Sequence, residues 1–173
     1  MGTRRRIGLV KTEFAEAAER HLDDVHAYLV YLTGHRGTAE ELAAETFARA
    51  CERWRRFDPR RGSARTWLCQ LARSTALDHF RAEERRRPRE HAYAAELPGE
   101  VEDGLFGGLS PELERALAAM SAGEREVIAL RVLLDLEIDT AARVLGISST
   151  ACTTRLSRAL KKLEERMSAD VAA

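Results

Sequence analysis

The chain has 173 residues and a net charge of zero, because 28 basic residues balance 28 acidic ones. This balance excludes a protein that coats nucleic acid through bulk positive charge, and any basic surface must be local. No segment approaches the roughly 20 apolar residues that span a bilayer, and the apolar stretch Ile7–Val10 is too short for a secretory signal, so we expect a cytoplasmic protein without membrane insertion.

The first helix is expected from Thr12 to about Leu32, where apolar residues recur at steps of three and four. These positions are Phe14, Ala18, Leu22, Val25, Leu29 and Leu32. Gly34 is expected to end the helix, and residues 1–11 are expected to form a disordered N-terminal tail.

Two more helices are expected to complete an N-terminal helical domain over residues 12–87. One opens at Thr38, where Glu41 three residues later completes a capping-box pattern, and it ends at the Phe57–Pro59 turn. A basic loop leads into the other. In the helix that opens at Thr38, the expected inward positions are Leu42, Thr46, Phe47, Ala50 and Trp54. In the helix after the basic loop, they are Trp67, Leu68, Leu71, Ala72 and Phe80.

Residues 88–109 are expected to form a flexible acidic linker. This stretch is rich in Pro and Gly, contains five acidic residues against one basic residue, and lacks periodic apolar positions. Helix restarts at Ser110-Pro111, an N-cap followed by a first-turn proline. Ser121 and Glu124 form a second capping-box pattern, which opens a helix with apolar Val127, Leu130 and Leu134.

The last third of the chain has the spacing of a helix-turn-helix. Ala142 and Gly146 are four residues apart, apolar Ile147 follows, and Cys152 lies six residues past the glycine. The helix that begins near Ser148 has two stripes at helical spacing. The expected inward stripe is Leu156, Leu160, Leu163 and Met167, and the outward stripe is Arg155, Arg158, Lys162 and Arg166.

Such a cationic stripe suits DNA phosphates and guanine edges. The alternative is a solvated helix whose charges pair internally, as Lys161 and Glu165 would at four residues apart. We assign this second helical domain to residues 110–168 and a C-terminal tail to 169–173. The predicted fold class is all-α, with two small helical domains joined by a flexible linker.

Cysteine and histidine spacing gives no sign of a metal centre. Cys51, Cys69 and Cys152 are far apart on apolar helical faces, so we expect reduced, buried thiols. The histidines are His21, His26, His35, His79 and His91, and their spacing does not fit a ligand set. We therefore expect no metal, no cofactor and no enzymatic activity.

Two segments carry a family resemblance. Ala39–Arg87, with its WLCQLAR stretch, resembles the second conserved region of extracytoplasmic-function (ECF) sigma factors, and Ser121–Leu163 resembles their fourth region. ECF sigma factors are a subfamily of the sigma-70 family of bacterial RNA polymerase sigma factors. Two motif blocks in the family's order and spacing are far more specific than either block alone.

The resemblance implies an alternative sigma factor that binds the polymerase core at the β′ clamp and the β flap. Its N-terminal domain would recognise and open the minus-ten promoter element, and its helix-turn-helix would bind the minus-thirty-five element. The linker would thread toward the RNA exit path, where its acidity fits nucleic-acid mimicry and plain solvation equally well. The sequence leaves open whether an anti-sigma factor is a further partner.

By position, the resemblance assigns residues to three surfaces. The polymerase-binding residues are Glu40, Glu41 and Glu45. The minus-ten residues are Arg60, Arg61, Ser63 and Arg65 in a loop that would receive a flipped base, with Arg73, Ser74, Asp78 and Arg81 on the following helix. The minus-thirty-five residues are Ser149, Thr150, Thr153, Thr154, Arg155, Arg158 and Lys162. Since flipping a base costs a few kcal/mol of stacking, a preformed cationic pocket is required. Trp67 is expected to belong to the core.

The chain also departs from the family pattern. Ser74 stands where asparagine is usual, Ala44 where glutamine is usual, and Asp135 where glycine is common. Residues 150–153 replace a usual Gly-Thr-Val-Lys series, which removes one expected phosphate contact. The promoter sequence therefore does not carry over from relatives. Cys152 takes a buried valine position and is interpreted as a small hydrophobe rather than a redox sensor.

Two other functions remain open from the sequence. A stand-alone helix-turn-helix repressor or activator would normally need a dimer interface, and no heptad repeat supplies one. A protein-interaction adaptor that does not use DNA would make the outward arginines of the last helix dispensable.

Overall fold

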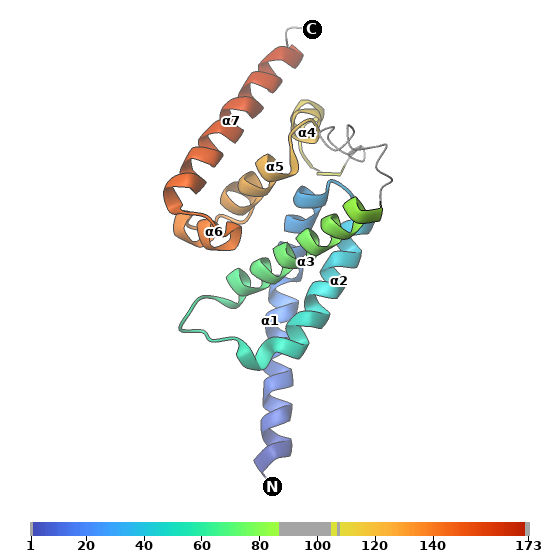
Figure 1. Cartoon of the computed structure of the whole chain (residues 1–173), viewed down its shortest axis with the longest axis vertical. Helices are drawn as coiled ribbons and strands as arrows, with labels where there is room; N and C mark the ends of the chain where they lie inside the picture. Colours follow the sequence, from blue (N-terminus) through green and yellow to red (C-terminus); the bar gives the residue numbers. More distant parts are fainter. Residues whose placement is uncertain (1, 87–104, 107, 172–173) are drawn as a thin grey trace.

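The computed structural model describes residues 2–86, 105–106 and 108–171, and this part of the chain consists of helices and connecting turns without a β-strand (Figure 1). The helices form an N-terminal and a C-terminal unit that lie against each other. None of the described helices combines the length and hydrophobicity that crossing a bilayer requires. The predicted all-α class is confirmed.

The N-terminal unit is a bundle of α1 (Gly2–Thr33), α2 (Arg36–Arg53) and α3 (Ala64–Arg86), with a 3-10 turn, η1 (Trp54–Arg56), after α2. Each of the three helices packs on the other two. The apolar positions predicted from periodicity supply most of the core, including Val25, Leu29, Leu42, Ala50, Leu68 and Ala72. As predicted, α1 ends just before Gly34, which has a positive φ of 75°.

Two predicted helix starts are wrong. Because α1 begins at Gly2, residues 2–11 continue the helix instead of forming a disordered tail. The segment contains no proline, and an internal glycine costs a helix only about 1 kcal/mol. In α2 the N-cap is His35, whose ring nitrogen accepts the Thr38 N–H at 3.2 Å. Thr38 therefore lies inside the first turn.

The predicted linker is also wrong at its C-terminal end. Leu105 and Phe106 are buried, and the Phe106 ring lies 4.6 Å from the ring of Tyr31 on α1. The Phe106 N–H donates to the Glu114 carboxylate at 3.1 Å, and the Arg36 guanidinium donates to the Leu105 carbonyl at 3.3 Å. These contacts fix residues 105–106 on the helices. Residues 88–104 and 107 of the predicted linker lie outside the described residues.

The C-terminal unit contains α4 (Pro111–Ala118), α5 (Ala122–Ile128), a π-helical turn η4 (Ala129–Leu133), α6 (Ile138–Leu145) and α7 (Ser149–Val171). Both predicted caps are confirmed. The Ser110 hydroxyl accepts the Leu113 N–H, and Ser121 and Glu124 form a reciprocal capping box. The structure also confirms the helix-turn-helix of α6 and α7, which turns at Gly146.

Three side chains are more exposed than predicted, and one of them is Leu22 on α1, which is 49% exposed. Leu160 on α7 is 41% exposed, because the inward line of this helix runs through buried Cys152 and Ala159. Leu160 follows Ala159 by one residue, which rotates it about 100° away from the core. Cys51 is exposed on α2, whereas Cys69 and Cys152 are buried as predicted.

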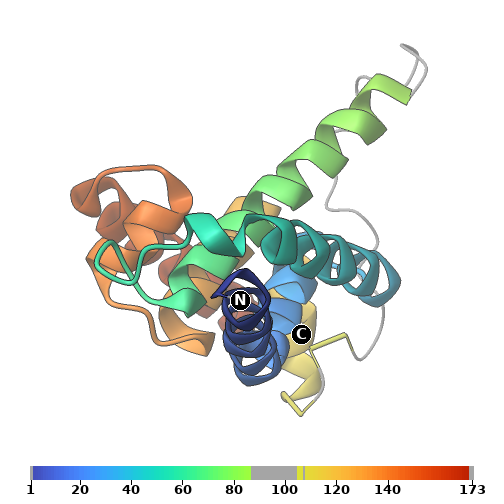
Figure 2. The same cartoon turned by 90° about the horizontal axis from the view of Figure 1, so that it is seen from below.

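The two units share one continuous hydrophobic core. Val25 and Leu29 of α1 belong to the same buried cluster as Val127 of α5 and Leu130 of η4. α1 packs on α5 and η4, and α3 packs on α6. Seen along α1, the loop between η1 and α3 lies beside the helix-turn-helix (Figure 2). The structure therefore brings the predicted minus-ten loop next to the C-terminal unit.

Replacing Gly146 with alanine is expected to destabilise the protein. Gly146 ends α6 with φ 68° and ψ 33°, and this left-handed conformation costs a residue with a Cβ about 1–2 kcal/mol. Urea unfolding followed by circular dichroism measures the loss. Gly123→Ala is the matched control, because Gly123 lies in α5 with open space around a Cβ, and there alanine should stabilise by about 0.4–1 kcal/mol. Equal shifts for both variants would contradict the prediction.

Candidate functional site

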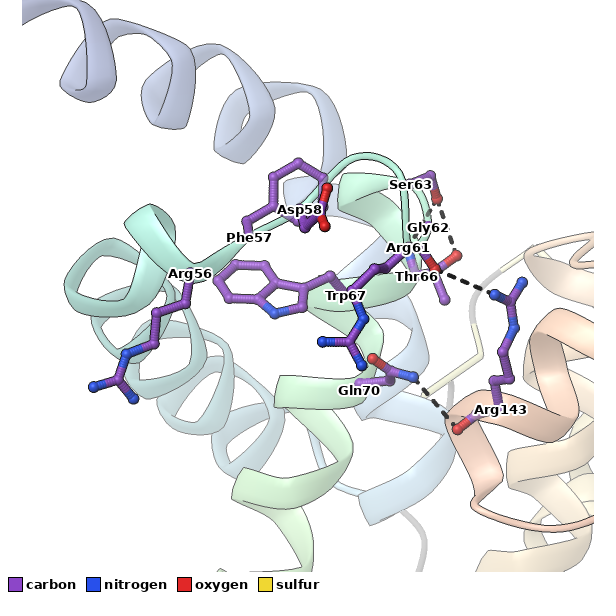
Figure 3. Close-up of a pocket in the computed structure, with 10 residues that line it drawn as sticks. All are labelled: Arg56, Phe57, Asp58, Arg61, Gly62, Ser63, Thr66, Trp67, Gln70 and Arg143. Atoms are coloured by element: carbon purple, nitrogen blue, oxygen red, sulfur yellow. Dashed lines mark hydrogen bonds between the residues drawn. The ribbon is translucent and has the colours of Figure 1, made fainter. Parts of the chain in front are cut away.

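A pocket opens at the loop between η1 and α3 (Figure 3). Its volume is about 290 Å³. The lining combines two aromatic rings with three guanidinium groups and several short polar side chains. The lining residues are Arg56, Phe57, Asp58, Arg61, Gly62, Ser63, Thr66, Trp67, Gln70 and Arg143.

Local hydrogen bonds give the pocket loop a defined backbone. The Asp58 carboxylate accepts the Arg60 N–H at 3.0 Å, and the Asp58 carbonyl accepts the Arg61 N–H at 3.0 Å. Ser63 then caps α3, because its hydroxyl accepts the Thr66 N–H at 3.2 Å. These bonds fix the backbone that carries Arg60 and Arg61 before any ligand binds.

Stacked aromatic rings form one wall of the pocket. The Phe57 ring stacks on Trp54 with centroids 4.8 Å apart, and it lies 5.6 Å from Trp67. Trp54 is buried and also meets Phe14 of α1 at 5.5 Å. Trp67 is half-buried, so it packs on these core rings and lines the pocket as well. A planar group that enters the pocket would meet an aromatic surface anchored in the core.

The predicted minus-ten residues divide among several environments. Arg61 and Ser63 line the pocket, and Arg60 is exposed beside it. The Arg65 guanidinium instead pairs with Asp24 of α1 at 2.7 Å, and Arg73 pairs with Glu126 of α5 at 2.8 Å.

Farther along α3, Ser74 and Arg81 are exposed. Asp78 pairs with Arg49 of α2 at 3.2 Å and with Arg81 at 3.5 Å. The eight side chains therefore do not converge on one point.

Sequence reasoning missed the contribution of the C-terminal unit to this pocket. The Arg143 guanidinium of α6 donates to the Arg61 carbonyl at 3.3 Å, and the Gln70 amide donates to the Arg143 carbonyl at 3.4 Å (Figure 3). Arg143 is separated from Arg61 by 82 residues. No local pattern signals a contact over that distance.

The N-terminal half of α7 carries the predicted minus-thirty-five residues other than Lys162. The Ser148 hydroxyl accepts the Ala151 N–H at 3.2 Å and caps the helix. Arg155 and Arg158 are exposed, and Cys152 on the opposite side is buried. The threonine hydroxyls of residues 153 and 154 donate to backbone carbonyls one turn earlier. This face offers two guanidinium groups and short polar side chains to a ligand.

The cysteine environments favour structural roles. Burial raises the pKa of the Cys69 thiol to about 12. Burial also raises the pKa of Cys152, although Arg131 and Arg155 partly oppose the shift. A raised pKa disfavours the reactive thiolate. The surroundings of Cys152 thus fit its interpretation as a small hydrophobe.

The Lys162 side chain of α7 points toward α5 rather than joining the exposed stripe of α7. Its ammonium binds both carboxylate oxygens of Glu124, at 2.8 and 3.0 Å. Burial raises the pKa of Glu124, but hydrogen bonds from Lys162 and Ser121 outweigh it and hold the pKa below its usual value. The pair joins α7 to the capping box of α5.

Lys162→Met is expected to lower the free energy of unfolding at pH 7 by about 0.5–1 kcal/mol, since the pair is partly exposed. The depressed pKa of Glu124 means that the stabilisation exists above the unfolded-state pKa of about 4.3 and disappears as the pH falls through the folded-state value. Urea unfolding at pH 7 and pH 3 measures the difference between variant and wild type. A difference that persists at pH 3 would contradict the role of the pair.

The predicted polymerase-binding residues Glu40, Glu41 and Glu45 are all exposed on α2. Glu45 pairs with Arg49, whose guanidinium also binds Asp78 of α3. No three His, Cys, Asp or Glu side chains within the described ranges gather as metal ligands.

Comparisons with known proteins agree with the two-unit organisation. Residues 17–86 match the family model described as Sigma-70 region 2, and residues 110–163 match the model described as Sigma-70, region 4. The chain is 35% identical over 139 residues to the ECF RNA polymerase sigma factor SigC of Mycobacterium tuberculosis. This match covers 79% of the chain and 73% of SigC. It is 31% identical over 154 residues to the ECF RNA polymerase sigma factor BldN of Streptomyces coelicolor. That match covers 87% of the chain but only 58% of BldN, so the chain spans little more than half of this relative's length.

Two solved structures share the fold. One is the sigma factor RpoE in complex with the anti-sigma factor NepR from Bartonella quintana, with a TM-score of 0.76, 22% identity, and coverage of 91% of this chain and 98% of that one. The other is CnrH in complex with the cytosolic domain of CnrY, with a TM-score of 0.66 and 23% identity. The match covers 92% of this chain and 90% of that one.

Proposed function

Because the chain belongs to the ECF sigma factors of the sigma-70 family, which act in promoter recognition and transcription initiation, we propose that its two units read two separate promoter elements. The N-terminal unit of α1, α2 and α3 recognises and opens the minus-ten element. The C-terminal unit, which ends in α7, binds the minus-thirty-five element through its helix-turn-helix. The protein contributes binding specificity to the polymerase and no chemistry of its own.

The pocket between η1 and α3 is the observation that carries the minus-ten assignment. A flipped base must regain stacking and find compensation for the lost pairing. The rings of Phe57 and Trp67 supply a stacking surface. Arg61 in the lining and exposed Arg60, its neighbour in the chain, suit the adjoining phosphates. A volume of about 290 Å³ gives room for one base.

The exposed face of α7 supports the minus-thirty-five assignment. Arg155 and Arg158 are one turn apart on the outer side of a helix that follows a short α6, the arrangement in which a recognition helix enters a major groove. Guanidinium groups there reach phosphates and guanine edges. Ser149, Thr150, Thr153 and Thr154 add short polar groups on the first turns of the same helix.

The partners follow from the same family membership. Glu40, Glu41 and Glu45 form an exposed acidic row on α2 that suits basic side chains of the polymerase β′ clamp, and the C-terminal unit contacts the β flap. This places the chain in the cytoplasm with the polymerase. An anti-sigma factor is a further partner in this proposal, since both structural neighbours were solved with a second protein and the RpoE neighbour with the anti-sigma factor NepR.

The test mixes the purified chain with bacterial core polymerase on size-exclusion chromatography and then selects bound genomic fragments. Co-elution, with enrichment of two motifs at fixed spacing, is the expected result. Enrichment of a palindrome by the chain alone would instead support a dimeric repressor. Binding of neither polymerase nor DNA would support a protein-interaction adaptor. Glu40, Glu41 and Glu45 changed together to glutamine should weaken co-elution, while Glu164→Gln, on exposed α7 surface, should not.

A further inference from the structure

A carboxylate of α6 contacts the first residue of α7. The Asp139 carboxylate accepts a hydrogen bond from the Ser149 hydroxyl at 2.5 Å. Asp139 lies in the first turn of α6 and is exposed, and Ser149 begins α7 and is half-buried. Charge-assisted O–H bonds to a carboxylate are short and about twice as strong as neutral hydrogen bonds. The pair therefore fixes the direction in which the Ser149 hydroxyl points.

This bond also decides which hydrogen-bonding group Ser149 offers to a ligand. A serine hydroxyl has one donor and two acceptor lone pairs, so by itself it suits any base edge. An ionised carboxylate has no proton to give, and Ser149 must therefore be the donor of the pair. Because its only proton is used, the Ser149 oxygen meets a ligand as an acceptor.

The threonines of the next turn have the same polarity. The hydroxyls of Thr153 and Thr154 donate to the carbonyls of Ser149 and Thr150, both at 3.0 Å. Carbonyl oxygens only accept, so both hydroxyl protons are used within the helix. Thr153 and Thr154 are exposed. Three hydroxyl oxygens near the N-terminal end of α7 thus act as acceptors, whereas the arginines farther along the helix offer only donors.

We propose that Asp139 is a specificity-determining residue for the minus-thirty-five element, because it makes Ser149 an acceptor that selects a base with an exocyclic amino group. The proposal rests on the proposed function, since it requires α7 to lie in the major groove. Adenine presents its N6 amino group there and cytosine its N4 amino group, whereas guanine and thymine present oxygen acceptors. On the strand that Ser149 contacts, adenine or cytosine is therefore preferred over guanine or thymine.

The charge of Asp139 strengthens this preference. Hydrogen bonds in a chain polarise one another, so the carboxylate makes the Ser149 oxygen a better acceptor. A base carbonyl placed against the pair would meet acceptors with no proton between them, and a desolvated acceptor without a partner is costly. A base amino group instead satisfies the Ser149 oxygen, and the exposed carboxylate is a second acceptor for it. Asp139 thus acts against the wrong base as well as for the right one.

The experiment measures base preference on the complex of the full chain with core polymerase. The duplexes carry the minus-thirty-five motif recovered by the genomic selection, and all four base pairs are compared at each motif position in competition for binding. Every base pair has one amino-bearing base in the major groove, so inverting the pair moves the amino group to the other strand. The readout is the ratio of the affinities for a pair and its inverse. A change in protein charge acts through phosphates and alters both affinities alike.

The wild type should prefer adenine or cytosine over the inverted pair by about fivefold at one position, which is the effect of one hydrogen bond. Ser149→Ala should bring this ratio to about one at that position alone. Asp139→Ala frees the Ser149 proton and should likewise make the position tolerate all four bases. Asp135→Asn is the matched control, because Asp135 is exposed in the same unit and its φ of 47° suits asparagine. The control should keep the wild-type ratio. Alanine suits a helix, so Ser149→Ala carries the test if Asp139→Ala fails to fold.

Three results would overturn the proposal and leave the proposed function intact. A preference for guanine or thymine at the position that Ser149→Ala affects would mean that Ser149 donates to the base. Unchanged ratios in Ser149→Ala would mean that Ser149 does not contact a base. Unchanged ratios in Asp139→Ala, with weaker binding to every duplex, would mean that Asp139 only holds α6 against α7. A wild-type complex without base preference at any position would instead contradict the proposed function itself.

Discussion

Changing Arg60 and Arg61 together to alanine is expected to abolish promoter opening while leaving duplex binding intact. Arg60 is exposed beside the pocket between η1 and α3, and Arg61 lines it. Each hydrogen bond to a charged partner contributes about 1.5–3 kcal/mol, so losing two contacts should reduce opening by about a hundredfold or more. The measurement is the permanganate reactivity of thymines near the start site in complexes with core polymerase.

The matched control for this variant is Arg53→Ala with Arg55→Ala. Both residues are exposed at the end of α2 and in η1, and neither lines the pocket. The control loses the same charge and should open the promoter normally. Normal opening by the Arg60 and Arg61 variant would contradict the pocket assignment, whereas equal loss in both variants would show that overall charge, rather than the pocket, drives opening.

Changing Arg155 or Arg158 to alanine is expected to weaken binding to the promoter duplex. A guanidinium that reads a base edge contributes about 1–3 kcal/mol of discrimination, which corresponds to a loss of roughly fivefold to more than a hundredfold. A residue that contacts phosphate should also reduce the slope of log affinity against log salt by about one. The measurement is a salt titration of duplex binding with polymerase bound.

Arg115→Ala is the control for the α7 variants. Arg115 lies on α4 and is exposed, and α4 packs on α7. Its loss removes the same charge from another helix and should leave affinity and slope near the wild-type values. If Arg155→Ala and Arg158→Ala each bound with an unchanged slope and affinity, the recognition face would have to lie elsewhere on the unit.

The sequence predicted the helix-turn-helix and the caps of the C-terminal unit well because these depend on local chemistry. The Ser121 and Glu124 capping box and the turn at Gly146 each involve residues within a few positions of one another. Local chemistry also explains the error at α2. The N-cap of α2 is His35 instead of Thr38, and histidine is not among the residues that usually cap helices.

The predicted site was less complete, because its contacts join distant parts of the chain. The family resemblance assigned Arg61 and Ser63 to the pocket loop, and both residues line the pocket. It did not indicate that Arg65 would turn to Asp24 of α1, or that Lys162 would bind Glu124 of α5. A charged residue on a helix face has the same local pattern whether it meets solvent, DNA or a carboxylate of another helix.

What the sequence determined by itself is the family, the all-α class and most helix ends, since apolar periodicity and capping groups act over one or two turns. Only the tertiary structure decided that the two units share one core, that Arg143 completes the pocket, and that Glu126 holds Arg73. These features depend on which helix faces meet after folding. Glu126 and Arg73 are 53 residues apart, and their pairing follows from packing rather than from any local pattern.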